Sequence, residues 1–253
     1  MMSIQVPPGY YGPRCEMLAF IPRTCTSVLD VGCGVGDFGK KVKELIGTRV
    51  WGVEVLEDAA REAARKLDRV LLGSFQEAQA LLAEERFDCI TFLDSLEHMV
   101  DPWAALKAAA GLLSEKGSIV ASIPNVRYWP NLKHLLFARD WQYVDIGILD
   151  RTHLRFFTER SMRRMLEDVG LEVGLLQGIN QLTPGKLRKK SVLYLAGLLL
   201  GRDIEFCQFA VVSSRPASGS SSVMARDPVA GVVRDGRLLS GAAARTARGS
   251  GSA

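Results

Sequence analysis

The chain has 253 residues, of which 47% are hydrophobic, and it carries a formal net charge of +4 at pH 7. This length and apolar content are sufficient for one α/β domain of about 200 residues with tails. Much of the basic excess lies in the C-terminal stretch without any apolar periodicity, so there is no basic, aromatic-rich face for nucleic acid. The five cysteines form no C-x-x-C pair, which argues against a disulfide framework and favours a reducing compartment.

The sequence also lacks signals for export or for a membrane span. The N-terminus has no basic-then-apolar pattern of a signal peptide, and no apolar run reaches transmembrane length. The longest run, 192–200, is about half the length that a bilayer requires, and it follows the basic run 186–190. We interpret 186–200 as a helix that packs on the core in preference to one on a membrane surface. A cytoplasmic protein is therefore expected.

Strand and helix patterns alternate along the first half of the chain, which predicts a doubly wound α/β fold with helices on both faces of a mostly parallel sheet. Short apolar, β-branched runs predict five strands, at 27–31, 50–54, 70–73, 87–93 and 118–123. Helical patterns lie between them, at 37–46, 57–67, 76–85 and 102–114.

The alternation stops after the fifth strand. Residues 124–150 are rich in Pro, Trp, Tyr and Asn and contain one short amphipathic stretch, 131–138. A helix is predicted over 159–169, ended by Gly170, and two final strands are predicted, at 171–177 and 205–213. The ends, 1–8 and 214–253, are predicted to be loose and disordered, because their composition cannot bury enough apolar surface to offset the ordering entropy.

The most informative segment is 28–39, a short apolar strand that leads through a glycine-rich turn into a helix. Gly32, Gly34 and Gly36 permit a tight turn and leave no side chain between the main chain and a ligand. The helix beyond the turn offers free N–H groups at the positive end of its dipole. Asp30, at the end of the strand, suits a nucleoside with an ammonium group better than one with a pyrophosphate.

The glycines alone leave two ligand classes open. Gly34, Gly36 and Gly39 also fit the dinucleotide fingerprint G-x-G-x-x-G, and Glu54 follows where a ribose-binding acid is expected in either case. NAD and S-adenosylmethionine are both compatible with such a turn. Asp30 favours S-adenosylmethionine, because a carboxylate next to a pyrophosphate is repulsive. No tyrosine begins the Tyr-x-x-x-Lys pattern of short-chain dehydrogenases, which further disfavours NAD.

Three motifs together carry a resemblance to a known family: Asp30-Val-Gly-Cys-Gly-Val-Gly36, Glu54 and Phe92-Leu-Asp-Ser-Leu-Glu-His98. They resemble the class I S-adenosylmethionine-dependent methyltransferases over residues 9–213, and within this class the bacterial methionine-biosynthesis and ubiquinone O-methyltransferase branch. The resemblance implies a seven-stranded, mostly parallel sheet with an antiparallel last strand. It also implies that the segment 124–158 caps the substrate pocket.

The resemblance implies most of the cofactor contacts. The methionine amino group is expected near Asp30, and both ribose hydroxyls on Glu54, whose carboxylate can accept two hydrogen bonds. The acid that the class usually carries after the third strand is absent, and Ser74 and Phe75 stand there, at the expected adenine edge and face.

Two charged residues complete this set. Asp94 is expected at the methionine end or at the opening toward the acceptor, with a helix cap as the alternative. Arg14 is expected to pair with the methionine carboxylate through its planar guanidinium, with a surface arginine as the alternative. The predicted cofactor-binding residues are Arg14, Asp30, Gly32, Gly34, Gly36, Glu54, Ser74 and Asp94.

Two histidines are the candidate catalytic residues. His153 lies on the loop before the 159–169 helix, and an imidazole is the natural side chain to deprotonate a hydroxyl near neutral pH. A structural histidine that caps this helix is the alternative. His98 belongs to a Leu-Glu-His pattern that the branch places beneath the acceptor pocket. His134 is interpreted as a solvated or packing residue.

A metal ion is a further hypothesis that comes from similarity. Asp94, Glu97, His98 and His153 resemble the metal ligands of small-RNA 2′-O-methyltransferases, which chelate vicinal hydroxyls. Asp94 is one methylene shorter than the first glutamate of that family, which weakens the case.

The predicted function is O-methylation of a sugar or secondary-metabolite hydroxyl, with a small molecule or glycan as acceptor. The motifs 122–127 and 147–158 resemble a subgroup associated with such acceptors. Two alternatives remain: an N-methyltransferase or methionine-biosynthesis-type protein, and a non-catalytic partner subunit that binds the cofactor. The sequence leaves the oligomeric state open.

Overall fold

The computed structural model of the chain describes residues 12–182 and 197–217. The predicted loose start, 1–8, most of the predicted helix 186–200 and the predicted tail from residue 218 lie outside the described residues. The last residues of that predicted helix, 197–200, are helical.

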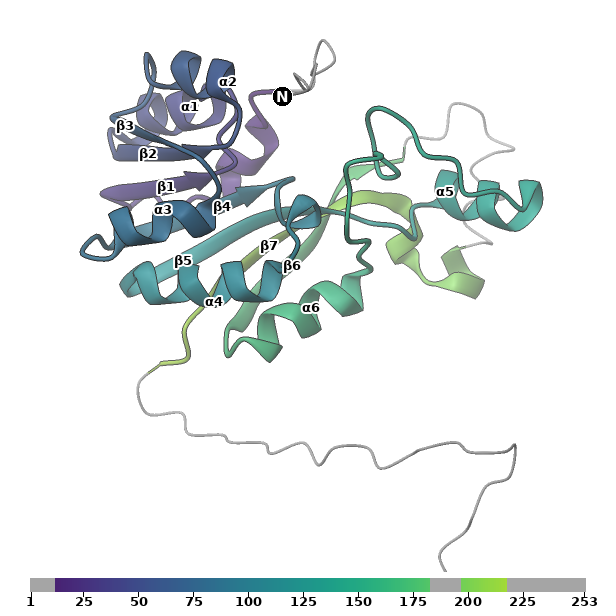
Figure 1. Ribbon diagram of the computed structural model, residues 1–253. Helices are drawn as coiled ribbons and strands as arrows, with labels where there is room; N and C mark the ends of the chain where they lie inside the picture. Colours follow the sequence, from purple (N-terminus) through teal and green to yellow (C-terminus); the bar gives the residue numbers. More distant parts are fainter. Residues whose placement is uncertain (1–11, 183–196, 218–253) are drawn as a thin grey trace, which may run out of the picture. The chain divides into compact units, whose positions relative to one another are not determined.

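In the described part of the chain, seven strands form one sheet in the order β3-β2-β1-β4-β5-β7-β6 (Figure 1). The neighbouring pairs from β3 to β5 are parallel, and β7 is antiparallel to both β5 and β6. The doubly wound fold with an antiparallel last strand is thereby confirmed. The strands are β1 (Ser27–Val31), β2 (Arg49–Glu54), β3 (Arg69–Leu72), β4 (Phe87–Leu93), β5 (Leu113–Pro124), β6 (Glu172–Gln181) and β7 (Phe206–Ser214).

Helices cover both faces of the sheet, α1 and α2 on one and α3, α4 and α6 on the other (Figure 1). Successive strand residues point to opposite faces, so Val28 joins the core under α1 and Leu29 joins the core under α4. The α-helices are α1 (Asp37–Ile46), α2 (Glu57–Ala63), α3 (Phe75–Leu82), α4 (Pro102–Leu112), α5 (Trp129–Lys133) and α6 (Glu159–Asp168). The short helices are η1 (Cys15–Phe20), η2 (Leu96–His98), the π-helix η3 (His134–Ala138) and η4 (Arg202–Glu205).

The clearest difference from the sequence expectation is at the end of α4. The helix ends at Leu112 instead of 114, and β5 begins at Leu113 instead of 118. Leu113 is buried and pairs in register with Phe87 of β4, so the backbone becomes extended five residues before the predicted start of the strand. Local helix propensity is outweighed here by the burial of one leucine.

The strand order places a ligand crevice between β1 and β4. The chain runs outward from β1 to β3 and then returns to β4, so the connections on the two sides leave in opposite directions. In open α/β sheets, ligands bind outside the carboxyl ends of the strands at such a point. Asp30, Glu54 and Asp94 all lie at or just beyond carboxyl ends of these strands.

Gly36 should tolerate a side chain less well than Gly47, although both have a positive φ, of +79° and +66°. A Cβ at Gly36 would lie 2.9 Å from the Cα of Ala63 in α2, whereas nothing lies within 4 Å of one at Gly47. Gly47→Ala is expected to lower the unfolding free energy by about 1–2 kcal/mol from backbone strain alone. Gly36→Ala is expected to lower it by more, because the new Cβ would also collide with α2. Urea denaturation of both variants measures the difference, and equal losses would contradict the close approach.

Candidate functional site

The glycine turn after β1 has the left-handed backbone that the sequence predicts. Gly32, Gly34 and Gly36 have φ values of +77°, +53° and +79°. The amides of Gly32 and Cys33 donate to the carbonyl of Val53 at 2.9 and 3.1 Å, which attaches the turn to the end of β2. Main-chain atoms therefore line the crevice at this point.

Glu54 joins the two turns that flank the crevice. Its Oε2 accepts from the Gly34 amide at 2.8 Å, and its Oε1 accepts from the Leu56 amide at 2.9 Å. The side chain is buried, yet each carboxylate oxygen has a second lone pair for a ligand hydroxyl. Glu54 thus has a structural task that the sequence did not reveal, in addition to its predicted role at the ribose.

Asp30 is only 2% exposed and accepts a hydrogen bond of 2.6 Å from Thr91 Oγ1. Burial raises the pKa of its carboxyl group to about 6; the hydrogen bond from Thr91 opposes the shift, and the charge of Glu54 adds to it. A cationic group of a ligand would offset this burial, because it favours the charged carboxylate.

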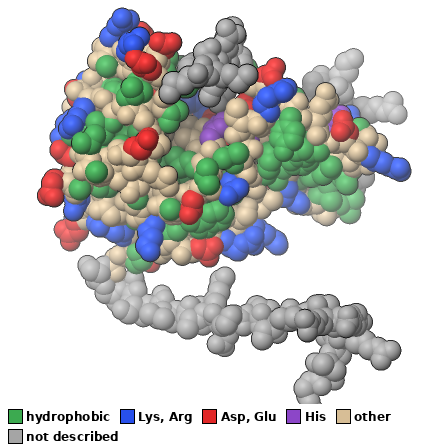
Figure 2. Space-filling view, in the orientation of Figure 1, with side chains coloured by type: hydrophobic (Ala, Val, Ile, Leu, Met, Phe, Trp, Pro, Cys, Tyr) green, Lys and Arg blue, Asp and Glu red, His purple; other side chains and the backbone are tan. Residues whose placement is uncertain are grey.

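Two adjoining cavities lie along the carboxyl edge of the sheet. The larger, of about 780 Å³, includes Glu54, Ser74 and Phe75 in its lining. The smaller, of about 250 Å³, includes Asp30 and Arg14. The two share four lining residues, Gly32, Asp94, His98 and Asp150. Figure 2 shows a hollow on this face with a histidine side chain visible in it.

Ser74 and Phe75 lie in the larger cavity, where the adenine was expected, but both also have structural roles. The Ser74 hydroxyl forms a capping box with Glu77 at the start of α3. The Phe75 ring packs edge-on against Phe92 at 5.8 Å between ring centroids and is almost fully buried. Contact with a ligand is thus restricted to the parts of these residues that line the cavity.

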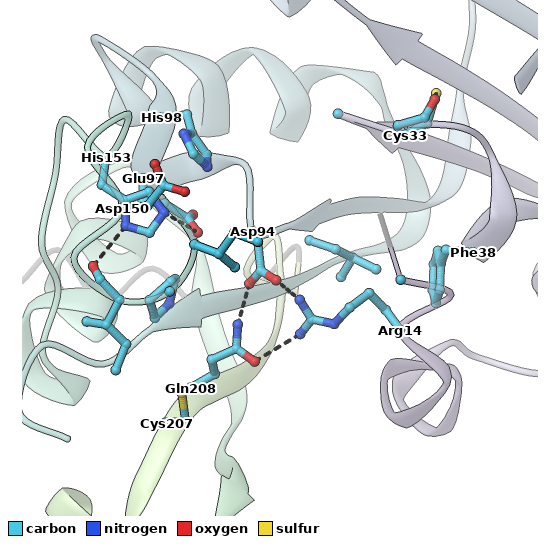
Figure 3. A pocket seen from close by; sticks show the side chains of 18 of the residues that line it. Arg14, Cys33, Phe38, Asp94, Glu97, His98, Asp150, His153, Cys207 and Gln208 are labelled. Atoms are coloured by element: carbon cyan, nitrogen blue, oxygen red, sulfur yellow. Dashed lines mark hydrogen bonds and ion pairs between the residues drawn. The ribbon is translucent and has the colours of Figure 1, made fainter. Parts of the chain in front are cut away.

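Arg14 and Asp94 form an ion pair that Gln208 of β7 completes (Figure 3). Gln208 accepts from Arg14 at 3.2 Å and donates to Asp94 at 2.7 Å, and Ser122 donates to the same carboxylate at 3.0 Å. Both charged residues have a left-handed backbone, with φ of +42° and +51°. Asp94 caps no helix among the described residues, and Arg14 lines the smaller cavity.

The second group of polar side chains consists of Glu97, His98 and His153, from η2 and the loop before α6 (Figure 3). One potential ligand atom from each lies within 4.8 Å of the other two. The two imidazole rings meet edge-on at 4.6 Å, and His153 Nε2 lies 3.9 Å from Glu97 Oε1. Thr158, and not His153, caps α6, so the helix cap that was the alternative role for His153 is not formed.

The environment of this group favours neutral side chains. Glu97 is 1% exposed, and burial raises its pKa to about 8. Burial also lowers the pKa of both histidines, and His153 lowers that of His98 further. Neither carboxylate oxygen of Glu97 has a hydrogen-bond partner among the residues that the structure describes. Asp94, the fourth residue of the metal hypothesis, lies outside the group and is held by Arg14, Ser122 and Gln208.

Sequence reasoning missed three contributors to the site. Thr91 follows Asp30 by 61 residues, and Gln208 follows Asp94 by 114, so no local pattern connects either pair. The backbone carbonyl of Ile148, which contacts His153, has no sequence signal at all. Thr91 could have been predicted as a partner of Asp30 only from the strand order and the pairing register of β1 and β4, in which the two residues are opposite each other.

Comparison with known proteins identifies the family. A methyltransferase-domain family matches residues 10–175. The chain belongs to this family, the class I S-adenosylmethionine-dependent methyltransferases. The ubiquinone biosynthesis O-methyltransferase of Cupriavidus pinatubonensis is 31% identical over 160 residues, 60% of this chain and 62% of that protein. That of Idiomarina loihiensis is 32% identical over 167 residues, 60% of this chain and 64% of that protein. The matched region thus spans less than two thirds of either relative.

Solved methyltransferases share the fold. A SAM-dependent methyltransferase from Archaeoglobus fulgidus has a TM-score of 0.58 and 20% identity, covering 79% of this chain and 91% of that one. The plantazolicin methyltransferase BpumL, in complex with SAH, has a TM-score of 0.54 and 15% identity. The match covers 79% of this chain and 80% of that one. The predicted family, fold and cofactor are therefore confirmed. Within the described ranges, no helix has the length and apolar character needed to cross a membrane.

The residues of the crevice fit the cofactor of this family. The larger cavity has the size of a drug-like ligand site. Glu54 provides a buried carboxylate at its wall, and Asp30 provides another in the smaller cavity. The glycine turn leaves its main chain open between them. A hydroxyl-bearing, cationic nucleoside suits this distribution of charge.

Glu54→Ala is expected to weaken the binding of S-adenosylhomocysteine by about 1.5–3 kcal/mol, because hydrogen bonds to a charged acceptor are lost. Isothermal titration calorimetry measures the loss, and circular dichroism verifies that the variant is folded. Glu57→Ala, at an exposed acid three residues away, is the matched control and should bind normally. Unchanged affinity in Glu54→Ala would contradict the assignment.

The affinity for S-adenosylhomocysteine should increase as pH rises through about 6, because the Asp30 carboxyl group loses its proton there and can then attract the ligand's ammonium group. The measurement is a titration series from pH 5 to pH 7 on the native chain and on Asp30→Asn. Glu54 and both histidines of the site are present in both proteins, so the difference between the two curves isolates Asp30. Parallel curves would place the ammonium group elsewhere.

Proposed function

We propose that this chain transfers the methyl group of S-adenosylmethionine to a hydroxyl group of a sugar, glycan or secondary metabolite. One observation carries the proposal: the group of Glu97, His98 and His153 lines the same small cavity as Asp30 and Gly34. Residues suited to activating a hydroxyl are thus next to residues suited to holding the methyl donor.

The chain's own residues divide the work of binding. S-adenosylmethionine, when bound, supplies an electrophilic methyl group. Glu54 would hold the ribose end, and Asp30 and Arg14 the methionine end. Arg14 has five N–H donors, so its contacts with Glu16, Asp94 and Gln208 leave others for a carboxylate. In-line displacement requires the methyl group to be aligned with the acceptor oxygen, so this positioning contributes a large part of the rate acceleration.

The acceptor side of the small cavity comes largely from the 124–158 segment. Ile146, Ile148 and His153 line it, opposite the glycine turn. An unactivated hydroxyl is a poor nucleophile, and the Glu97 group brings two imidazoles, which can accept its proton near neutral pH, to the wall of this cavity. The relatives' designation as O-methyltransferases also supports an oxygen acceptor.

The direct test uses the purified full chain, labelled S-adenosylmethionine and a panel of hydroxyl and amine acceptors. Transfer to hydroxyl compounds by the chain alone supports the proposal. Transfer to amines only would identify an N-methyltransferase, and cofactor binding without any transfer would identify a partner subunit.

His153→Ala is expected to lower kcat by about 10²–10⁴-fold while the affinity for S-adenosylhomocysteine is retained, because activation of the acceptor is lost and the cofactor contacts remain. Steady-state kinetics with the best hydroxyl acceptor and calorimetry measure the two effects. His134→Ala, at an exposed histidine outside the cavity, is the control. Full activity in His153→Ala would leave this loop as pocket wall and favour an amine acceptor.

A further inference from the structure

The Glu97 side chain is buried without a hydrogen-bond partner in the described part of the chain, and a histidine that deprotonates the acceptor hydroxyl does not by itself explain this environment. Its carboxyl group is 1% exposed, and both oxygens have no hydrogen-bond partner in the part of the chain that the structure describes. A buried polar group without a hydrogen bond destabilises the fold, and more so when it is charged. A cation in contact with the carboxylate would offset this cost. Figure 3 shows Glu97 lying among His98, His153 and Asp150 at one end of the cavity.

In both histidines, a backbone carbonyl oxygen close to Nδ1 fixes the orientation of the imidazole ring. His153 Nδ1 lies 2.9 Å from the carbonyl oxygen of Ile148, and His98 Nδ1 lies 3.3 Å from that of Thr152. A carbonyl only accepts, so Nδ1 donates in each ring, and the lone pair is on Nε2. Histidine ligands of metal ions are held in this way, with one ring nitrogen donating to an oxygen and the other facing the metal.

A buried carboxylate reinforces the orientation of His98. The Thr152 hydroxyl donates to Asp150 Oδ1 at 2.7 Å, and its oxygen lies 3.1 Å from His98 Nδ1. Because the hydroxyl donates its hydrogen to Asp150, its oxygen acts as the acceptor for the N–H of the His98 imidazole. Asp150 also accepts from the Thr152 amide at 2.8 Å, which fixes the loop. The Asp150–Thr152–His98 chain is an outer shell of the kind that supports metal ligands.

We infer that Glu97, His98 and His153 form a binding site for one divalent transition-metal ion, which holds and activates the oxygen of the acceptor. The inference rests on the proposed function for its role, but not for the existence of the site. One carboxylate and two imidazoles favour ions such as Zn²⁺, Mn²⁺, Fe²⁺ or Co²⁺ over Mg²⁺ or Ca²⁺.

The local charges support a cation here. The Asp150 carboxylate is also buried, on the Thr152 side of the group. The two carboxyl groups together provide the negative field that a divalent cation requires.

The three ligands leave the remaining coordination positions to other atoms. A site with three protein ligands is typical of catalytic metals, which keep positions for water or substrate. Asp94 cannot supply a fourth ligand in this arrangement, because Arg14, Ser122 and Gln208 hold its carboxylate. The small cavity borders all three ligands, so the acceptor's oxygen atoms can reach the ion.

The test is metal binding by the untagged full chain, stripped with EDTA and titrated with Zn²⁺ and Co²⁺. The native chain is expected to bind one equivalent of each, and Co²⁺ should produce a visible spectrum without thiolate charge-transfer bands. Glu97→Gln and His98→Ala should each weaken binding by more than the roughly 10–100-fold that the loss of an outer-shell partner costs, because each removes a direct ligand. His134→Ala, the exposed histidine, should bind as the native chain does. S-adenosylhomocysteine affinity shows that each variant is folded.

Each outcome decides for or against the site. No saturable binding, equal binding in Glu97→Gln, or thiolate bands that place the ion on a cysteine would overturn it. Full methyl transfer by the stripped chain in EDTA would overturn the metal's role and leave the proposed function intact. Metal binding that depends on these residues, without transfer to any hydroxyl, would support the site and contradict the proposed function.

Discussion

The carboxylate of Glu54 is the contact on which the geometry of the crevice depends. It accepts from the turn after β1 and from the turn after β2, at Gly34 and Leu56. Both turns would otherwise expose unpaired amides to a buried space, which is costly. A single side chain at the tip of β2 therefore fixes the main-chain surface that faces the ligand. This explains how a turn built largely from glycine, with its high conformational freedom, can present a defined shape.

The acceptor side depends on a second connection of this kind. The backbone carbonyl of Glu97 accepts from the amides of Leu154 and Arg155, at 2.8 and 3.1 Å. These bonds hold the loop that carries His153 against η2. The side chain of Glu97 faces His153 while its main chain anchors the neighbouring residues. The two halves of the candidate site, far apart in the sequence, are thus aligned by backbone hydrogen bonds and not by side-chain packing alone.

The sequence was a good guide where one local pattern determines one local structure. The strands 27–31 and 87–93 and the helix 37–46 have the predicted bounds, because β-branched runs and glycine turns act over a few residues. The α4–β5 junction was misplaced, because the burial of Leu113 is a tertiary effect. Asp30 and Asp94 were found from motifs, but their partners Thr91 and Gln208 were not. Those contacts arise from strand order and loop path, which no short motif encodes.

The position of β7 has a consequence for how the site is assembled during synthesis. The strand is the last of the described sheet in the chain, yet it inserts between β5 and β6 and carries Gln208 to Asp94. The cofactor crevice, built from β1, β2 and β4, can form while the rest of the chain is still on the ribosome. The Arg14–Asp94–Gln208 contact forms only after β7 emerges, because it joins residues 114 positions apart. Until then β5 and β6 expose unpaired edges, so the nascent domain passes through an aggregation-prone stage that ends when its last strand docks.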